Sequence, residues 1–285
     1  MDALPLKAAL TACSNGLSPR DAAAVERLEE VLSRMGLRCV RSPALFAEGA
    51  SPQSAPPAER ARILNDFFAD ESVGWILDLS GGDLANGVLP YLDYRLIRRS
   101  RAVFCGYSDL TSVVNAIWAK TGRACPLYQA RRLVGPDADR QQADFAAVLR
   151  GRAWQPFAAD FVRGRMMEGV LAGGNARCLL KLAGTEYWPS LDGCLLLLEA
   201  QSGGEAQVHA YCAQLAQLGA FAHIRGLILG SFTQLDAQCG PQAAQQIALQ
   251  YVPDTLPVAR TAQVGHGADS RTAVIGAPLR LTARS

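Results

Sequence analysis

The sequence has little of several things, and each shortage excludes a class of protein. Only 19% of its 285 residues are charged and 49% are hydrophobic, so disorder is excluded and a large core is expected. The net charge of +2 gives no support for a nucleic-acid binder, which would be strongly basic. No apolar run approaches the ~20 residues of a membrane-spanning helix, which excludes an integral membrane protein. At this length the chain forms one large domain or two ordinary ones.

The chain holds only three histidines, and no two of its eight cysteines form a Cys-x-x-Cys pair. A structural zinc site therefore has no support in the sequence, and we expect no metal and no cofactor. Most of the cysteines lie in apolar segments, where a free thiol acts as a small hydrophobic side chain. This usage is typical of a reducing compartment, so we expect a cytoplasmic protein.

The segment that ends at Cys13 is similar to a lipoprotein signal. Leu10-Thr11-Ala12-Cys13 has the form of its cleavage site, but the stretch before it starts with Asp2 and is interrupted by Pro5 and Lys7. A signal peptide needs a positive start and about 7–15 apolar residues. We therefore expect a buried first strand from Leu6 to Ala12.

Strands and helices alternate along the first half of the chain, which predicts a parallel sheet with helices on both faces. The rhythm changes after residue 165, where strand-like runs outnumber clear helices. The sequence thus predicts an α/β protein with domains at residues 1–130 and 166–285, joined by a linker at 131–165. The expected strands are 6–12, 37–40, 75–79, 102–107, 170–171, 195–198 and 227–229, and the expected helices are 19–35, 60–69, 109–120, 137–150 and 207–218.

Ser108 lies where a buried strand runs into a helix, in Gly106-Tyr107-Ser108-Asp109. This turn places a hydroxyl beside a helix N-terminus, where backbone N–H groups can stabilise an oxyanion. It resembles the nucleophile elbow of serine hydrolases but lacks the second glycine of Gly-x-Ser-x-Gly. A helix cap is the more frequent role for such a serine, and the motif alone does not exclude it.

Three further features could belong to a site. Ser80-Gly81-Gly82-Asp83 would let a ligand approach the backbone, although it lacks a phosphate-loop frame and could be an ordinary turn. Glu199 follows five apolar residues and is either a surface charge or a site carboxylate. His266 lies between two glycines in a loop, whereas His209 and His223 are interpreted as structural.

Ser108, Glu199 and His266 together form the set that nucleophilic catalysis requires. A serine hydroxyl is a weak nucleophile until an imidazole takes its proton, and a carboxylate then orients the imidazole and stabilises its charged form. Their order in the sequence does not show that they meet in space.

The order of several motifs resembles the LD-carboxypeptidase family of serine peptidases, which includes the microcin C self-immunity peptidases. The resemblance extends over nearly the whole chain. The motifs that carry it are Gly81-Gly82, Leu89-Pro90-Tyr91-Leu92-Asp93-Tyr94, Gly106-Tyr107-Ser108-Asp109-Leu110-Thr111, Gly173-Gly174-Asn175, Gly184-Thr185, Leu198-Glu199, Gly226-Leu227-Ile228-Leu229-Gly230 and Gly265-His266-Gly267.

The resemblance implies a Rossmann-like parallel-sheet N-terminal domain and a smaller β-rich C-terminal domain. It also implies that Ser108 is the nucleophile, His266 the general base and Glu199 its orienting partner. The backbone N–H groups of Gly82 and Asp109 would form the oxyanion hole. A homodimer is expected on the same ground.

The expected activity is that of a serine carboxypeptidase acting on a small peptide, with release of the terminal D-alanine from murein tetrapeptide in cell-wall recycling. One alternative is a peptidase that detoxifies a microcin C-like peptide–nucleotide antibiotic, and another is a two-domain binding protein without catalysis. The chain departs from the family pattern at Gln129-Ala130, Ala200 and Asp83–Asn86, which bears on substrate preference.

The sequence offers candidate side chains for binding either a murein peptide or a peptide–nucleotide. A murein peptide needs a cation for its free carboxylate, and Arg131, Arg132 and Arg177 are candidates. A nucleotide needs an aromatic platform, which Tyr187 and Trp188 would supply unless they form a packed corner.

Overall fold

Strand β1 (Lys7–Thr11) lies inside a four-stranded parallel sheet of order β2-β1-β3-β4. The other strands are β2 (Arg38–Arg41), β3 (Val73–Asp78) and β4 (Val103–Cys105), each within one or two residues of a predicted segment. The computed structural model describes residues 6–283, so the outer ends of the predicted terminal domains, residues 1–5 and 284–285, lie outside the described residues. The Rossmann-like arrangement predicted for this half of the chain is confirmed.

Alternation of side chains along these strands explains why helices cover both faces of the sheet. Leu10 and Leu77 face a core shared with α1 (Ala22–Arg34) and α5 (Ala138–Leu149). Ala9 and Ile76, one residue earlier in each strand, face the opposite core. That core is formed with α2 (Pro57–Ala69), α3 (Tyr94–Arg99) and α4 (Thr111–Thr121).

The second domain is built on a six-stranded mixed sheet of order β12-β7-β8-β9-β10-β6. Its central strand β8 is fully buried, which explains the unbroken apolar run at 194–198. Four strands are parallel and the two edge strands are antiparallel. The strands are β6 (Asp160–Arg163), β7 (Met166–Asn175), β8 (Cys194–Ala200), β9 (Gly226–Phe232), β10 (Val258–Arg260) and β12 (Pro278–Thr282).

Helices of this domain are short apart from the predicted one, α7 (Glu205–Gln217). The sequence pattern did not reveal the others because four to seven residues are too few to show a helical period. They are α6 (Ala176–Leu180), α8 (Ala220–His223), α9 (Thr233–Cys239) and α10 (Ala243–Ala248).

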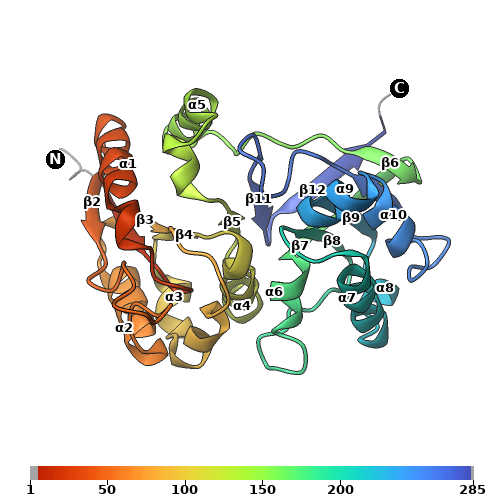
Figure 1. The fold of residues 1–285 in the computed structure, drawn as a ribbon, viewed down its shortest axis with the longest axis horizontal. Helices are drawn as coiled ribbons and strands as arrows, with labels where there is room; N and C mark the ends of the chain where they lie inside the picture. The colour runs from red at the N-terminus through yellow and green to blue at the C-terminus, as the bar shows by residue number, and fades with distance from the viewer. Residues whose placement is uncertain (1–5, 284–285) are drawn as a thin grey trace.

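The segment 131–165 is in contact with both domains, which lie side by side in Figure 1. Phe145 of α5 stacks on Tyr128 of the first domain, with 5.6 Å between the ring centroids. β6 pairs with β10 at the edge of the second sheet. A further link is a two-stranded antiparallel sheet of β5 (Cys125–Leu127) and β11 (Ala273–Ile275). In the described part of the chain, no helix has the length and apolar composition to cross a bilayer.

Exposure of the cysteine thiols gives a first prediction. Cys239 is exposed, Cys39 is half-buried with its pKa raised by burial to about 11, and the other six are buried, Cys13 among them. Because the thiolate is the reactive form, DTNB at pH 8 should titrate one thiol rapidly and all eight after denaturation. The fast reaction should be absent in Cys239→Ser; two or more fast thiols would contradict the packing described here.

Candidate active site

Ser108 has a backbone conformation shared with no other non-glycine residue in the described part of the chain. Its φ is +58°, in the left-handed region that side chains with a Cβ rarely adopt. It lies three residues after the end of β4 and begins a single 3₁₀ turn that leads into α4. Tyr107 holds the cap position of that turn, and the Ser108 hydroxyl makes no cap hydrogen bond. The strained turn therefore presents the hydroxyl outward, and the helix-cap interpretation does not hold.

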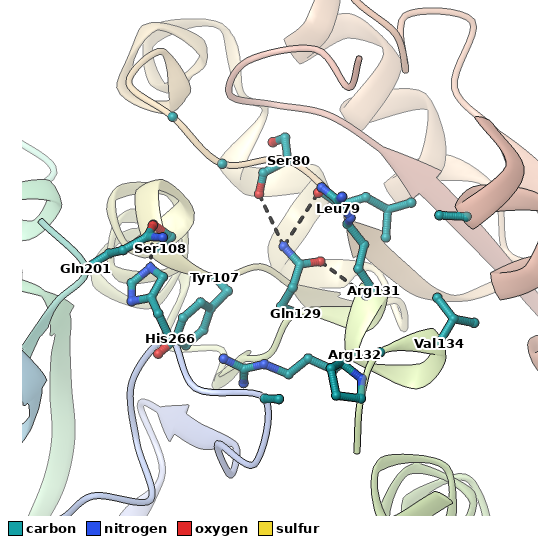
Figure 2. Close-up of a pocket in the computed structure, with 16 residues that line it drawn as sticks. Leu79, Ser80, Tyr107, Ser108, Gln129, Arg131, Arg132, Val134, Gln201 and His266 are labelled. Carbon is teal, nitrogen blue, oxygen red and sulfur yellow. Dashed lines mark hydrogen bonds between the residues drawn. The ribbon is translucent and has the colours of Figure 1, made fainter. Parts of the chain in front are cut away.

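The hydroxyl of Ser108 meets His266 across the boundary between the domains. His266 Nε2 lies 3.0 Å from Ser108 Oγ, and the two side chains point toward each other in Figure 2. His266 Nδ1 lies 2.7 Å from Glu199 Oε2. This second contact has the distance of an ion pair but not the alignment of a hydrogen bond. Catalytic contacts are often poorly aligned without substrate and become aligned in the complex.

Glu199 is a buried carboxylate next to His266 and not a surface charge. It lies near the end of β8 and is 1% exposed. Asn175, its register partner on β7, donates from Nδ2 to Glu199 Oε1 at 3.2 Å. The Asn175 Oδ1 also accepts from the backbone N–H of Cys178 and so caps α6. Sequence reasoning gave Asn175 no role, although the Gly-Gly-Asn motif was a signal.

The loop that carries His266 is fixed to the residue that precedes the nucleophile. The Gly265 carbonyl accepts from the Tyr107 hydroxyl at 2.6 Å and from Arg132 Nη2 at 2.8 Å. The Arg132 guanidinium lies 4.7 Å from the centre of the Tyr107 ring, as expected for a cation–π contact. The Tyr107 and His266 rings meet edge to face at 5.2 Å. These contacts keep the imidazole next to Ser108.

Gly82 and Asp109 lie on the two segments that flank Ser108. Gly82 has a φ of +119°, and a Cβ there would fall within 2.3–2.6 Å of the Asn15 side chain. Only glycine therefore fits this turn. Asp109 follows the nucleophile, and its carboxylate is fully buried. Gly82 lines the same cleft as Ser108, and Asp109 is the next residue in the chain.

A cleft of about 530 Å³ opens over Ser108 and His266. Its charged lining is cationic, because it contains Arg131 and Arg132 but no aspartate or glutamate. Figure 2 shows the Gln129 amide in the middle of this cleft, where it donates to the carbonyls of Leu79 and Ser80. Gln129, one of the positions at which the sequence is expected to depart from the family pattern, therefore forms part of the cleft lining.

Several other candidate residues lie outside the cleft lining. Arg177 is paired with the Asp83 carboxylate. Tyr187 and Trp188 form a packed corner, with the Tyr187 ring 5.9 Å from that of Tyr94. His209 contacts Tyr251 and His223 pairs with Asp192. Within residues 6–283, no group of three or more His, Cys, Asp or Glu side chains could hold a metal ion.

Comparison with known proteins gives two matches to family models that follow each other along the chain. Residues 8–129 match the LD-carboxypeptidase N-terminal domain and residues 168–281 match the LD-carboxypeptidase C-terminal domain. "Putative carboxypeptidase YocD" of Bacillus subtilis is 27% identical, over 89% of this chain and 86% of the relative. "Probable murein peptide carboxypeptidase" of the same organism is 25% identical, over 77% and 72%. The microcin C7 self-immunity protein MccF of Escherichia coli is 24% identical, over 73% and 70%.

Solved structures show the same fold. MccF in complex with aspartyl sulfamoyl adenosine superposes with a TM-score of 0.85 at 22% identity, over 98% of this chain and 94% of MccF. Muramoyltetrapeptide carboxypeptidase from Oxalobacter formigenes has a TM-score of 0.82 at 21% identity, over 98% and 95%. The two-domain architecture is therefore common to a self-immunity protein and to a muramoyltetrapeptide carboxypeptidase.

Proposed function

The chain belongs to the LD-carboxypeptidase family, and we propose that it is a serine peptidase that releases the terminal D-alanine of a murein tetrapeptide. The observation that carries the proposal is the contact chain from Ser108 through His266 to Glu199, with distances of 3.0 and 2.7 Å. A binding protein without catalysis would need neither these contacts between the three side chains nor a serine in a strained backbone conformation.

The proposed reaction forms and breaks one covalent bond to the enzyme. Ser108 Oγ attacks the carbonyl carbon of the L,D-amide while His266 Nε2 takes the hydroxyl proton. The N–H groups of Gly82 and Asp109 stabilise the oxyanion, and the Glu199 carboxylate stabilises the imidazolium. The tetrahedral adduct expels D-alanine, whose amine receives the proton from His266. Water, deprotonated by the same imidazole, then hydrolyses the acyl-enzyme.

The charge of the cleft favours a murein peptide as the substrate. A murein tetrapeptide carries several free carboxylates, and the lining of the cleft includes two arginines and no aspartate or glutamate. Cleavage of a peptide–nucleotide antibiotic is the second candidate function, because the chain is similar to the self-immunity protein MccF. However, Tyr187 and Trp188, the expected platform for a nucleobase, are packed against the core and lie outside the cleft lining.

The deciding experiment compares kcat/KM on murein tetrapeptide with kcat/KM on an aminoacyl-sulfamoyl adenosine, with mass detection of released D-alanine for the first and of released sulfamoyl adenosine for the second. We expect the tetrapeptide to be preferred. A preference for the adenosine compound of more than about tenfold, or ~1.4 kcal/mol of transition-state binding, would replace the murein assignment with the antibiotic one. Failure of both substrates together with no labelling of Ser108 by a fluorophosphonate would contradict the serine mechanism.

Among the three arginines, we propose Arg131 for the substrate carboxylate. Arg177 is paired with Asp83, and Arg132 is committed to Gly265 and Tyr107. Arg131 lines the cleft, unlike Arg177, and its side chain is 41% exposed. Its guanidinium makes a 3.2 Å ion pair with Asp21, for which a substrate carboxylate would compete.

Arg131→Gln should raise KM for the tetrapeptide about tenfold and change kcat little, because a ground-state charge-assisted hydrogen bond is lost. Two analogues of the tetrapeptide, one amidated at D-glutamate and one at the C-terminus, identify the carboxylate that Arg131 binds. The difference in KM between Arg131→Gln and the unmodified protein should vanish on the analogue in which that carboxylate is replaced by a neutral amide. Arg41→Gln removes an arginine paired with Glu29 on the surface and should have no effect. An unchanged KM for Arg131→Gln would exclude this residue.

We also propose that the protein is a cytoplasmic homodimer, in line with its recycling role and its family. Light scattering at micromolar concentration tests the assembly, and a monomer would count against it.

A further inference from the structure

The carboxylate of Asp109 is buried beside the nucleophile and has a precise set of partners. It is fully buried, and its Oδ2 accepts from the Ser14 hydroxyl at 2.6 Å and from the Ala85 N–H at 2.9 Å. Its Oδ1 lies 2.5 Å from Lys181 Nζ. A buried carboxylate is tolerated only when a cation and hydrogen bonds replace its water. Lys181 is the one cation within ion-pair distance of Asp109 among the described residues.

That cation comes from the other domain. Lys181 directly follows α6 of the C-terminal domain, and its side chain is 18% exposed. The same ammonium donates to the Asp83 carbonyl at 2.8 Å. Arg177, one turn earlier on the same face of α6, donates to the Gly82 carbonyl at 3.2 Å and pairs with the Asp83 carboxylate. One helix face thus holds the 82–83 loop and the Asp109 turn together.

Both proposed oxyanion donors depend on this arrangement. The Gly82 N–H lies on the loop after β3, and the Asp109 N–H lies on the turn after β4. Lys181 is bonded to the residue next to Gly82 and to the side chain of Asp109. A displacement of about 1 Å between catalytic groups can cost on the order of 10²-fold in rate. A cation that spans both segments therefore fixes the spacing that matters for the oxyanion.

We propose that Lys181 is a positioning residue, which sets the spacing of the two oxyanion-stabilising turns from the opposite domain. The inference rests on the proposed function, because it assigns a role to Lys181 only if Ser108 forms an oxyanion adduct. It also explains why the catalytic site is completed by docking of the two domains, since the cation and both turns come from different sides of the boundary.

The test compares four variants in kcat and KM on the tetrapeptide, in the labelling rate of Ser108 by a fluorophosphonate, and in thermal unfolding. Lys181→Met should lower kcat on the order of 10²-fold with KM changed by less than about threefold. Labelling should slow in parallel. Lys181→Arg keeps the cation, and its kcat should be at least about tenfold higher than that of Lys181→Met.

Two further variants separate positioning from stability. Lys181→Met alone leaves a buried charge without a partner and could unfold the protein. The double variant Lys181→Met/Asp109→Asn removes both charges, so it should fold and remain as slow as Lys181→Met. The matched control is Lys120→Met, which removes the exposed cross-domain pair with Glu186 and should keep full activity.

Each outcome decides between the alternatives. Full activity of the double variant would show that Lys181 only neutralises Asp109, which overturns the inference. An unchanged kcat and labelling rate in Lys181→Met would also overturn it. If the unmodified protein is labelled at Ser108 but does not cleave the tetrapeptide, the proposed substrate is wrong. The labelling rates of the variants then still test the positioning role of Lys181. If Ser108 is not labelled at all, the proposed function is wrong, and the role proposed for Lys181 is wrong as well.

Discussion

Ser108→Ala and His266→Ala should each reduce turnover on the order of 10³-fold or more without unfolding the chain. In the proposed mechanism the serine supplies the nucleophile and the imidazole, 3.0 Å away, takes its proton, so neither is effective alone. The double variant should lose little beyond either single one, because the two side chains act as a unit. The measurement is a double-mutant cycle on kcat, with D-alanine release as the readout.

Matched controls for this cycle are available on the surface. Ser190 contacts Asp192 in an exposed turn, and His223 is 59% exposed and pairs with the same aspartate. Ser190→Ala and His223→Ala should therefore keep full turnover, and all variants should unfold cooperatively near the unmodified temperature. Multiplicative losses in the double variant would show that Ser108 and His266 act independently and would contradict the proposed mechanism.

Glu199→Gln should cost about 10³-fold in kcat or more, although the change is nearly isosteric. The amide removes the negative charge that stabilises the imidazolium. It also can present an N–H to His266 Nδ1, which favours the tautomer protonated on Nε2. That tautomer cannot accept the Ser108 proton. The Asn175 amide would still have an oxygen acceptor at this position, so the fold should be retained.

The control for the glutamate is Glu29→Gln, which removes an exposed carboxylate paired with Arg41. The circular dichroism spectrum of Glu199→Gln should match that of the unmodified protein, and its unfolding temperature should differ by no more than a few degrees. A variant that keeps turnover within about tenfold would show that another group orients the imidazole.

Much of the fold was readable from the sequence because short strands alternate with helices α1, α2 and α4 of 11–13 residues in the first domain. The buried strand β3 is a mainly apolar run, and α1 has a clear helical period, so both stand out along the chain. The short helices α6 and α8 to α10 have too few residues to show a period. They form because the sheet beneath them buries their apolar faces.

For the site, local sequence determined which residues could carry chemistry, and long-range packing decided which of them meet. The strand–Ser108–helix turn and the glycines around His266 are local features, so the motifs exposed them. The burial of Glu199, the alignment of Asn175 beside it and the pairing of Lys181 with Asp109 join residues far apart in the chain. Single-sequence patterns do not encode such distances, because the approach of two segments depends on the whole core between them.

The aromatic and basic candidates illustrate the same division. Their residue types were visible in the sequence, but Tyr187, Trp188 and Arg177 proved to pack or pair outside the cleft lining, whereas Arg131 and Arg132 line it. A side chain's type fixes what it can bind, and only the docking of one domain on the other fixes what it faces. The sequence by itself determined the α/β fold and the set of possible catalytic groups. The tertiary structure decided their partners, because those partners lie far apart in the sequence and, for Ser108 and His266, on opposite domains.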